Sequence, residues 1–129
     1  MTTSTSLPAA WRRTSRGQLT AARLRERNET SYETTCAVRG LPVSTHIAVT
    51  ATESSVLVTA TDMDVLADWL FVQGGSVSRT ELPSGQTVWT LRTVTWSDSP
   101  AFPVVPVFVS VVAPSEQTVL HEIATAVAS

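Results

Sequence analysis

Apolar residues are densest between residues 61 and 75, in the segment TDMDVLADWLFVQGG. Thr61 stands three residues before Asp64, which is the spacing of a helix-capping box, and Gly74–Gly75 supplies a left-handed stop. Between these two signals nearly every residue is apolar, apart from Asp64 and Asp68, which lie one turn apart. A helix that is apolar around most of its circumference must be covered on more than one side. The pattern therefore predicts a buried central helix.

Two alternating segments precede this helix. Residues 43–51 alternate between more and less apolar positions, which predicts a strand with one covered and one wetter face. The covered face is expected to carry Val43, Thr45, Ile47, Val49 and Ala51. After a turn at Thr52–Ser54, the apolar residues of Val56–Ala60 predict a second strand. We therefore expect a β-hairpin that leads into the central helix.

Three more strands are expected after the central helix. Val77–Leu82 is mostly polar and predicts an edge strand, whereas Thr87–Trp96 predicts a longer one. Val107–Val112 is apolar on both faces apart from Ser110, as is typical of a strand inside a sheet. The wetter faces are expected to carry Thr50, Thr87, Thr93 and Thr95, together with Trp89 or Trp96 according to the register. Such a face is usually plain solvated sheet, but an exposed tryptophan on it would favour a contact surface.

The C-terminal stretch predicts a second helix of the domain, with Ser115 as its N-cap after Pro114. Apolar side chains then recur at helical spacing, at Val119, Leu120, Ile123, Ala124 and Val127. Together the elements predict an α+β domain. It consists of a mostly antiparallel sheet of about five strands, with the buried central helix and the amphipathic C-terminal helix packed on one face.

The charge of the chain is unevenly distributed. Residues 1–30 carry six arginines and two glutamates, a net charge of +4, whereas residues 31–129 carry three arginines and nine acids, a net charge of −6. The two values add to the −2 of the whole chain. A basic arm on an acidic body is therefore the clearest large-scale feature.

The arm has few features of a packed element. A short helix is expected over Ser15–Arg27, although its apolar stripe is too thin to hold it on a core, and residues 28–35 are interpreted as a polar linker. We therefore divide the chain into a basic, partly helical or flexible N-terminal arm, residues 1–36, and a compact α+β domain, residues 37–129.

Targeting signals are weak. The arm lacks the apolar stretch of a secretory signal, and the longest apolar run, Val104–Ala113, is too short for the roughly 20 residues that span a bilayer. The arm is rich in Arg, Ser and Thr, which leaves a transit peptide as an alternative. A single cysteine, Cys36, fits a reducing compartment. We expect a soluble, cytoplasmic protein with no membrane partner.

No catalytic, cofactor-binding or metal-binding residue is predicted. The residues that could hold a hard metal are Asp62, Asp64, Asp68, His46 and His121. No motif joins them, and stabilisation of a helix N-terminus and of a solvated helix stripe accounts for the aspartates. Cys36 has no adjacent base or recognisable signature, so we interpret it as a bystander thiol. Gly74–Gly75 ends a helix instead of opening one, which excludes a phosphate loop.

The candidate contact residues all lie in the arm. They are Trp11, Arg12, Arg13, Arg16, Arg23, Arg25 and Arg27. Arginine neutralises phosphates and tryptophan stacks on bases, so the arm could bind nucleic acid, although the acidic body would be repelled by the same polyanion. Alternatively the arm lies across an acidic surface of its own body or of a neighbour, or it is a solvated tail without a partner.

These observations favour a small non-enzymatic protein-interaction module. It would be an accessory or adaptor protein, or a self-assembling subunit, with the arginine-rich arm as a tether. The alternative is a nucleic-acid-binding accessory protein that uses the arm, and a third hypothesis is a small enzyme with an unrecognised site.

Overall fold

The computed structural model describes residues 9–99, 103–115 and 121–127, and of residues 9–19, 121 and 122 it describes the backbone alone. Within these residues the fold is α+β, with three helices and a five-stranded sheet. In chain order the elements are α1 (Ala9–Arg39), β1 (Ala48–Ala51), β2 (Val56–Ala60), α2 (Met63–Gln73), β3 (Ser76–Glu81), β4 (Gln86–Val94), β5 (Pro106–Pro114) and α3 (His121–Ala126).

The sheet is mixed, with the strand order β1-β2-β5-β4-β3. Three neighbouring pairs are antiparallel, but β2 and β5 are parallel, so the prediction of a mostly antiparallel sheet is wrong. After β2 the chain crosses through α2 to the far edge, returns along β3 and β4, and inserts β5 beside β2. Antiparallel pairing with β4 fixes the direction of β5, and this direction is parallel to β2. The prediction that Val107–Val112 lies inside the sheet is confirmed.

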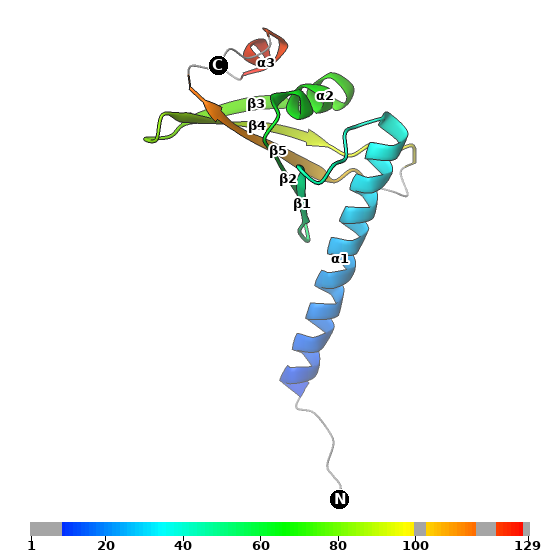
Figure 1. Ribbon diagram of the computed structural model, residues 1–129. Helices are drawn as coiled ribbons and strands as arrows, with labels where there is room; N and C mark the ends of the chain where they lie inside the picture. Colours follow the sequence, from blue (N-terminus) through cyan, green and yellow to red (C-terminus); the bar gives the residue numbers. More distant parts are fainter. Residues whose placement is uncertain (1–8, 100–102, 116–120, 128–129) are drawn as a thin grey trace, which may run out of the picture.

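The helices lie over one face of the sheet (Figure 1). α2 and α3 cover this face, and the C-terminal end of α1 contacts β1 and β2 before the helix runs away from the body. Alternate strand residues point into the layer between sheet and helices. They include Val56, Val58 and Ala60 of β2, Trp89 and Leu91 of β4, and Val107, Val109 and Val111 of β5, all of them buried.

The central helix begins one residue later than its capping signal. Asp62, not Thr61, is the N-cap, and its carboxylate accepts a hydrogen bond from the backbone N–H of Asp64 at 2.9 Å. The glycine stop is confirmed: Gly74 has a φ of 72°, and a Cβ on Gly75 would collide with the carbonyl of Arg92.

The central helix is covered on one broad side and not around its whole girth. Trp69 and Leu66 are fully buried, and Met63 and Val65 are nearly so. Phe71, however, is 90% exposed, which contradicts the prediction that the helix is enclosed on several sides. Apolar composition gives no direction, and one face of a single helix always points away from the sheet beneath it.

The most extensive correction concerns α1. The predicted short helix and polar linker are one continuous helix, Ala9–Arg39, which ends at Gly40 with a φ of 67°. Among residues 20–39 of α1, the buried side chains have helical spacing, but two of the four are polar: Asn28, Tyr32, Thr35 and Cys36. Because the buried side is partly polar, hydrophobic periodicity does not reveal it. The division of the chain at residue 37 stays a prediction.

Hydrogen bonds satisfy the two buried polar residues of α1. The Asn28 amide donates to the carbonyl of Thr52 at 2.8 Å. The Thr35 hydroxyl donates to the carbonyl of Ser31 at 2.7 Å and accepts from the backbone N–H of Trp96 at 2.9 Å. These bonds join α1 to the β1–β2 turn and to the segment that follows β4, so its C-terminal third belongs to the body.

The first predicted strand is mostly a loop. Only Ala48–Ala51 pair with β2, and Val43 is 72% exposed where a covered position was expected. Three of the threonines assigned to wetter faces are in fact buried on the covered face: Thr87, Thr93 and Thr95. Trp89 is buried beside them, and Trp96 is partly buried.

The C-terminal helix is confirmed over its described part. α3 packs against α2 and β3, Ile123 is fully buried, and Val127 forms a bridge with Val77. Ser115, predicted as the N-cap, lies in a turn directly after β5, where its backbone N–H donates to the carbonyl of Gly85 at 3.0 Å. The predicted positions Val119 and Leu120 lie outside the described residues. No helix among the described residues combines the length and the apolar character needed to cross a bilayer.

We predict that Trp69→Ala lowers the free energy of unfolding by about 3–5 kcal/mol, because it leaves a cavity in the layer between helices and sheet. Phe71→Ala, two residues away on the same helix, should change it by less than about 0.5 kcal/mol, since that ring lies in water. Urea unfolding of both variants measures the difference. Equal destabilisation would contradict the placement of α2.

Candidate functional site

Four of the seven arginine positions of α1 lie on one side of the helix. Residues 12, 16, 23 and 27 recur at i, i+4, i+11 and i+15, so they follow one line along a helix with 3.6 residues per turn. Arg25 falls on a different side, where its guanidinium lies 3.9 Å from the carboxylate of Glu53. α1 leaves the body toward its N-terminal end (Figure 1), and positions 23, 16 and 12 follow one another in that direction.

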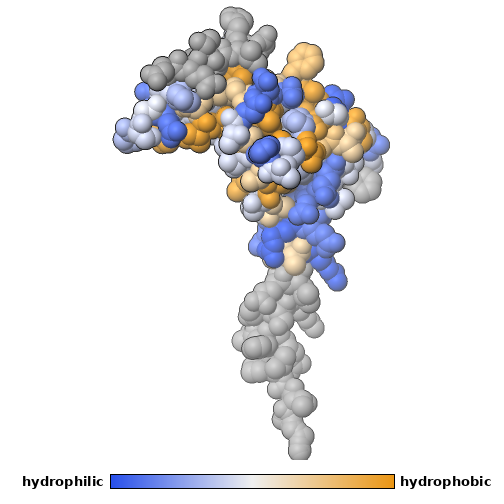
Figure 2. Space-filling view, in the orientation of Figure 1, coloured by the Kyte–Doolittle hydropathy of each residue, from blue (hydrophilic) through white to orange (hydrophobic). Residues whose placement is uncertain are grey.

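A groove lies beside the body end of this line. It has a volume of about 630 Å³ and separates α1 from the segment after β4. Its α1 side is lined by Arg23, Glu26, Arg27, Thr30, Ser31 and Thr34, and its other side by Trp96, Ser97 and Asp98. Hydrophilic surface extends along this part of α1, next to the more apolar body (Figure 2). We call this feature the α1 groove.

Trp96 has a fixed position in the α1 groove. It is partly buried, and its backbone N–H donates to the Thr35 hydroxyl of α1. No sequence pattern reveals this groove, because its two sides are more than 60 residues apart in the chain. The strand pattern leaves the face of Trp96 undetermined, and no periodic signal links it to Arg23 or Arg27.

The second surface is the face of the sheet opposite the helices. We call it the open face. Its outward positions, taken from the strand register, are Ala48 and Thr50 of β1, Leu57 and Thr59 of β2, Pro106, Phe108, Ser110, Val112 and Pro114 of β5, Gln86, Val88, Thr90, Arg92 and Val94 of β4, and Ser76, Ser78 and Thr80 of β3. Leu57, Val112 and Val94 are 42%, 41% and 38% exposed. Apolar and hydroxyl side chains thus dominate the open face.

The open face carries one charged residue, Arg92. Its guanidinium lies 5.8 Å from the ring centre of Phe108, the residue opposite it on β5. This cation–π contact keeps the charge over an aromatic ring of the same sheet. The acidic residues of α2 (Asp62, Asp64 and Asp68) belong to the other side of the molecule, where α2 covers the sheet.

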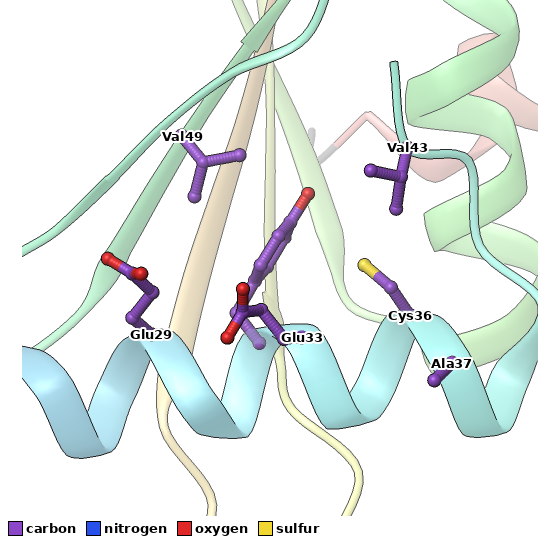
Figure 3. Close-up of a pocket in the computed structure, with 7 residues that line it drawn as sticks. Glu29, Glu33, Cys36, Ala37, Val43 and Val49 are labelled. Atoms are coloured by element: carbon purple, nitrogen blue, oxygen red, sulfur yellow. The ribbon is translucent and has the colours of Figure 1, made fainter. Parts of the chain in front are cut away.

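A second hollow, of about 490 Å³, lies between α1 and the chain around β1 (Figure 3). Glu29, Glu33 and Cys36 project from α1 on the side that faces Val43 and Val49. Tyr32 lines the same hollow and is 4% exposed. Its hydroxyl lies beside the Cys36 thiol and makes no hydrogen bond of ordinary geometry among the described residues.

The hollow does not activate Cys36. The residue is buried in α1, not placed in polar surroundings before a strand as its sequence position indicated. Burial raises the pKa of the Cys36 thiol, and the nearby Glu33 carboxylate raises it further, although contact with the Tyr32 hydroxyl acts in the opposite direction. A nucleophilic cysteine needs a lowered pKa. The geometry therefore favours the bystander interpretation.

The metal hypothesis gains no support from the arrangement of its residues. Within the described part of the chain, no three His, Cys, Asp or Glu side chains come close enough to hold an ion. Asp62 is occupied as the helix N-cap, and His46 is exposed in the turn before β1. His121 is the first residue of α3.

Comparison of the chain with known protein families, with curated protein sequences and with solved structures found no significant match. Function must therefore be argued from the α1 groove, the open face and the charge distribution.

The raised pKa values predict the alkaline behaviour of the protein. Burial raises the pKa of both Cys36 and Tyr32 in the folded state, so the unfolded chain releases these protons at lower pH. The free energy of unfolding should therefore fall as the pH rises above about 9, where an unfolded thiol ionises. Urea midpoints for the wild type and Cys36→Ala, measured at pH 7.5 and 10, show how much of this loss of stability comes from the Cys36 thiol.

The wild type should lose more stability over this interval than Cys36→Ala, whatever the starting stability of the variant. Equal losses would show that the thiol is not buried in the folded state.

Proposed function

We propose that this chain is a small non-enzymatic interaction module that associates with a second copy of itself through the open face, with α1 as a basic tether directed away from the body. The observation that carries the proposal is the composition of the open face. A body of net charge −6 presents a whole sheet face with a single charge, and that charge is basic.

Burial of the open face would be favourable. Its apolar residues form two rows, Leu57 with Phe108 and Val112 with Val88, on either side of a central row of Thr59, Ser110 and Thr90. These threonines and the serine are uncharged and cost less to desolvate than carboxylates. Within each row two apolar side chains are neighbours, and neighbouring exposed apolar side chains are typical of an interaction site.

The size of the open face fits an interface between two copies. Five strands spaced about 4.8 Å apart give a flat area on the order of 500 Å². Because side chains project from the sheet, the accessible area of such a face is larger than its flat area. It approaches the roughly 800 Å² per partner that stable interfaces bury. The whole face is therefore required, which favours face-to-face contact of two sheets.

Charge favours a second copy over an unrelated partner. In a two-fold symmetric contact each residue also occurs on the partner's side, so an acidic face would meet an equally acidic face. The outward positions of the open face include no carboxylate, so two copies can meet there without this repulsion although the body as a whole is acidic. The acidic side of the molecule, which carries α2, remains in solvent in this arrangement.

The anchoring of α1 supports its role as a tether. Asn28, Tyr32 and Thr35 hold its C-terminal third on the body, and the rest of the helix runs outward from there. A rigid helix keeps the arginine line at a fixed angle to the sheet, and two associated copies would present two such lines.

We predict that the wild type sediments as a dimer at micromolar concentrations and that Leu57→Glu sediments as a monomer, because the substitution places a buried charge on each side of the contact. Leu57 is 42% exposed in the single chain, so the folded monomer should tolerate the change. Analytical ultracentrifugation measures the result, and circular dichroism checks the fold.

Phe71→Glu is the matched control, since Phe71 is the apolar side chain exposed most fully on the other side of the molecule, at 90%. This variant should remain dimeric. A monomeric wild type, or a dimer that Phe71→Glu dissociates and Leu57→Glu does not, would contradict the proposal.

A further inference from the structure

We propose that the α1 groove binds single-stranded nucleic acid, with a base stacked on Trp96 and phosphates placed along the arginine line of α1. The inference concerns a different surface from the open face and does not depend on self-association.

The first support is the unpaired charge of the two arginines at the groove. Arg23 makes no ion pair or hydrogen bond among the described residues, and Arg27 reaches only the neighbouring Asn28 side chain, at 3.3–3.4 Å. They stand one helical turn apart on the same side of α1. Neither guanidinium group therefore has to break an ion pair with a carboxylate before it binds a phosphate.

The second support is the continuation of the charge along the helix. Positions 12 and 16 continue the line of Arg23 and Arg27 toward the N-terminal end of α1. The whole line, from residue 12 to residue 27, is about 22 Å long at the rise of an α-helix. Residues 1–25 contain no acid. A backbone that leaves the groove in this direction therefore passes successive arginines and no carboxylate.

The third support is the aromatic side of the groove. Trp96 is partly exposed, and the hydrogen bond from its backbone N–H to Thr35 fixes its backbone beside α1, so its ring is available at the groove. Stacking of a base on an aromatic ring, next to a basic track, is the usual way in which proteins bind single strands without sequence preference. Hydroxyls of Thr30, Ser31 and Thr34 lie along the same wall and can donate to phosphate or sugar oxygens.

The acids at the groove explain why the ligand should be a single strand. Glu26 and Asp98 also line the groove and balance the two arginines there, so the net attraction comes from the helix beyond it. A flexible strand can follow one line of arginines and avoid these carboxylates. A duplex is stiff and presents two charged backbones, one of which would approach the acidic body.

Fluorescence anisotropy with a labelled oligothymidylate of twelve nucleotides tests the inference on the full-length protein. The wild type should bind at low salt, and if the four arginines of the line meet phosphates its affinity should fall about fiftyfold between 50 and 200 mM salt. Arg23→Gln and Arg27→Gln should each weaken binding and lower the salt slope by about 0.7. Trp96→Leu should weaken binding roughly tenfold and leave the salt slope unchanged.

Arg25→Gln is the matched control, because it removes the same charge from the same helix but on the side that faces Glu53. Its affinity should remain within about twofold of the wild type. The dimer variant Leu57→Glu should retain the affinity of each chain for the oligonucleotide, which separates this inference from self-association. Loss of binding in Leu57→Glu would overturn the independence of the two surfaces.

Several outcomes would overturn the inference itself. They are no binding at low salt, equal weakening by Arg23→Gln and Arg25→Gln, tighter binding of duplex than of single strand, or displacement of the oligonucleotide by an acidic peptide at lower concentration than by unlabelled oligothymidylate. The last result would assign the groove to an acidic protein segment.

Discussion

The contact between Tyr32 and Trp69 determines how the molecule is arranged. The two rings are stacked, with centres 5.7 Å apart and an angle of 13° between their planes. Tyr32 belongs to α1 and Trp69 to α2, so the stack fixes the long helix to the helix that covers the sheet. Such a pair is worth about 0.5–1.5 kcal/mol beyond the burial of its area. The Tyr32 hydroxyl and the Trp69 Nε1 are buried without a hydrogen-bond partner among the described residues, so packing must outweigh this cost.

The same contact orients both candidate surfaces. Because the C-terminal third of α1 is part of the core, the arginine line leaves the body in a defined direction and Trp96 is held against the helix through Thr35. The helices gather on one side of the sheet and leave the open face free (Figure 1). An uncharged face and a basic helix thus lie on one small chain. The first suits contact with another protein, and the second suits an anionic ligand.

The hydrophobic pattern of the sequence was sufficient to predict several strands and the end of the central helix. The alternation of Val56, Val58 and Ala60 predicted β2, the apolar run at Val107–Val112 predicted an inner strand, and the glycine stop at Gly74 predicted the end of α2, all of which are confirmed. The pattern did not predict the direction in which a helix side chain points or the strand beside which another strand pairs. It could not tell that Phe71 points to water, or that β5 enters beside β2 in parallel.

The α1 groove and the open face are harder to predict from the sequence than the helices and strands are. α1 was divided because its buried side carries Asn28 and Thr35, and polar residues indicate core positions only when their hydrogen-bond partners are known. The arginines were recognised, but their common line requires one continuous helix. Trp96 could be joined to Arg23 only by tertiary structure, since the two sides of the α1 groove are more than 60 residues apart in the chain.

Amide hydrogen exchange, resolved along α1, tests most directly the claim that its C-terminal third belongs to the core. The account predicts a step in protection near residue 28, with amides 32–36 exchanging as slowly as those of β5 and amides 20–24 exchanging much faster. Uniformly fast exchange along the whole of α1 would contradict it, because neither the Tyr32–Trp69 stack nor the fixed direction of the arginine line could then exist.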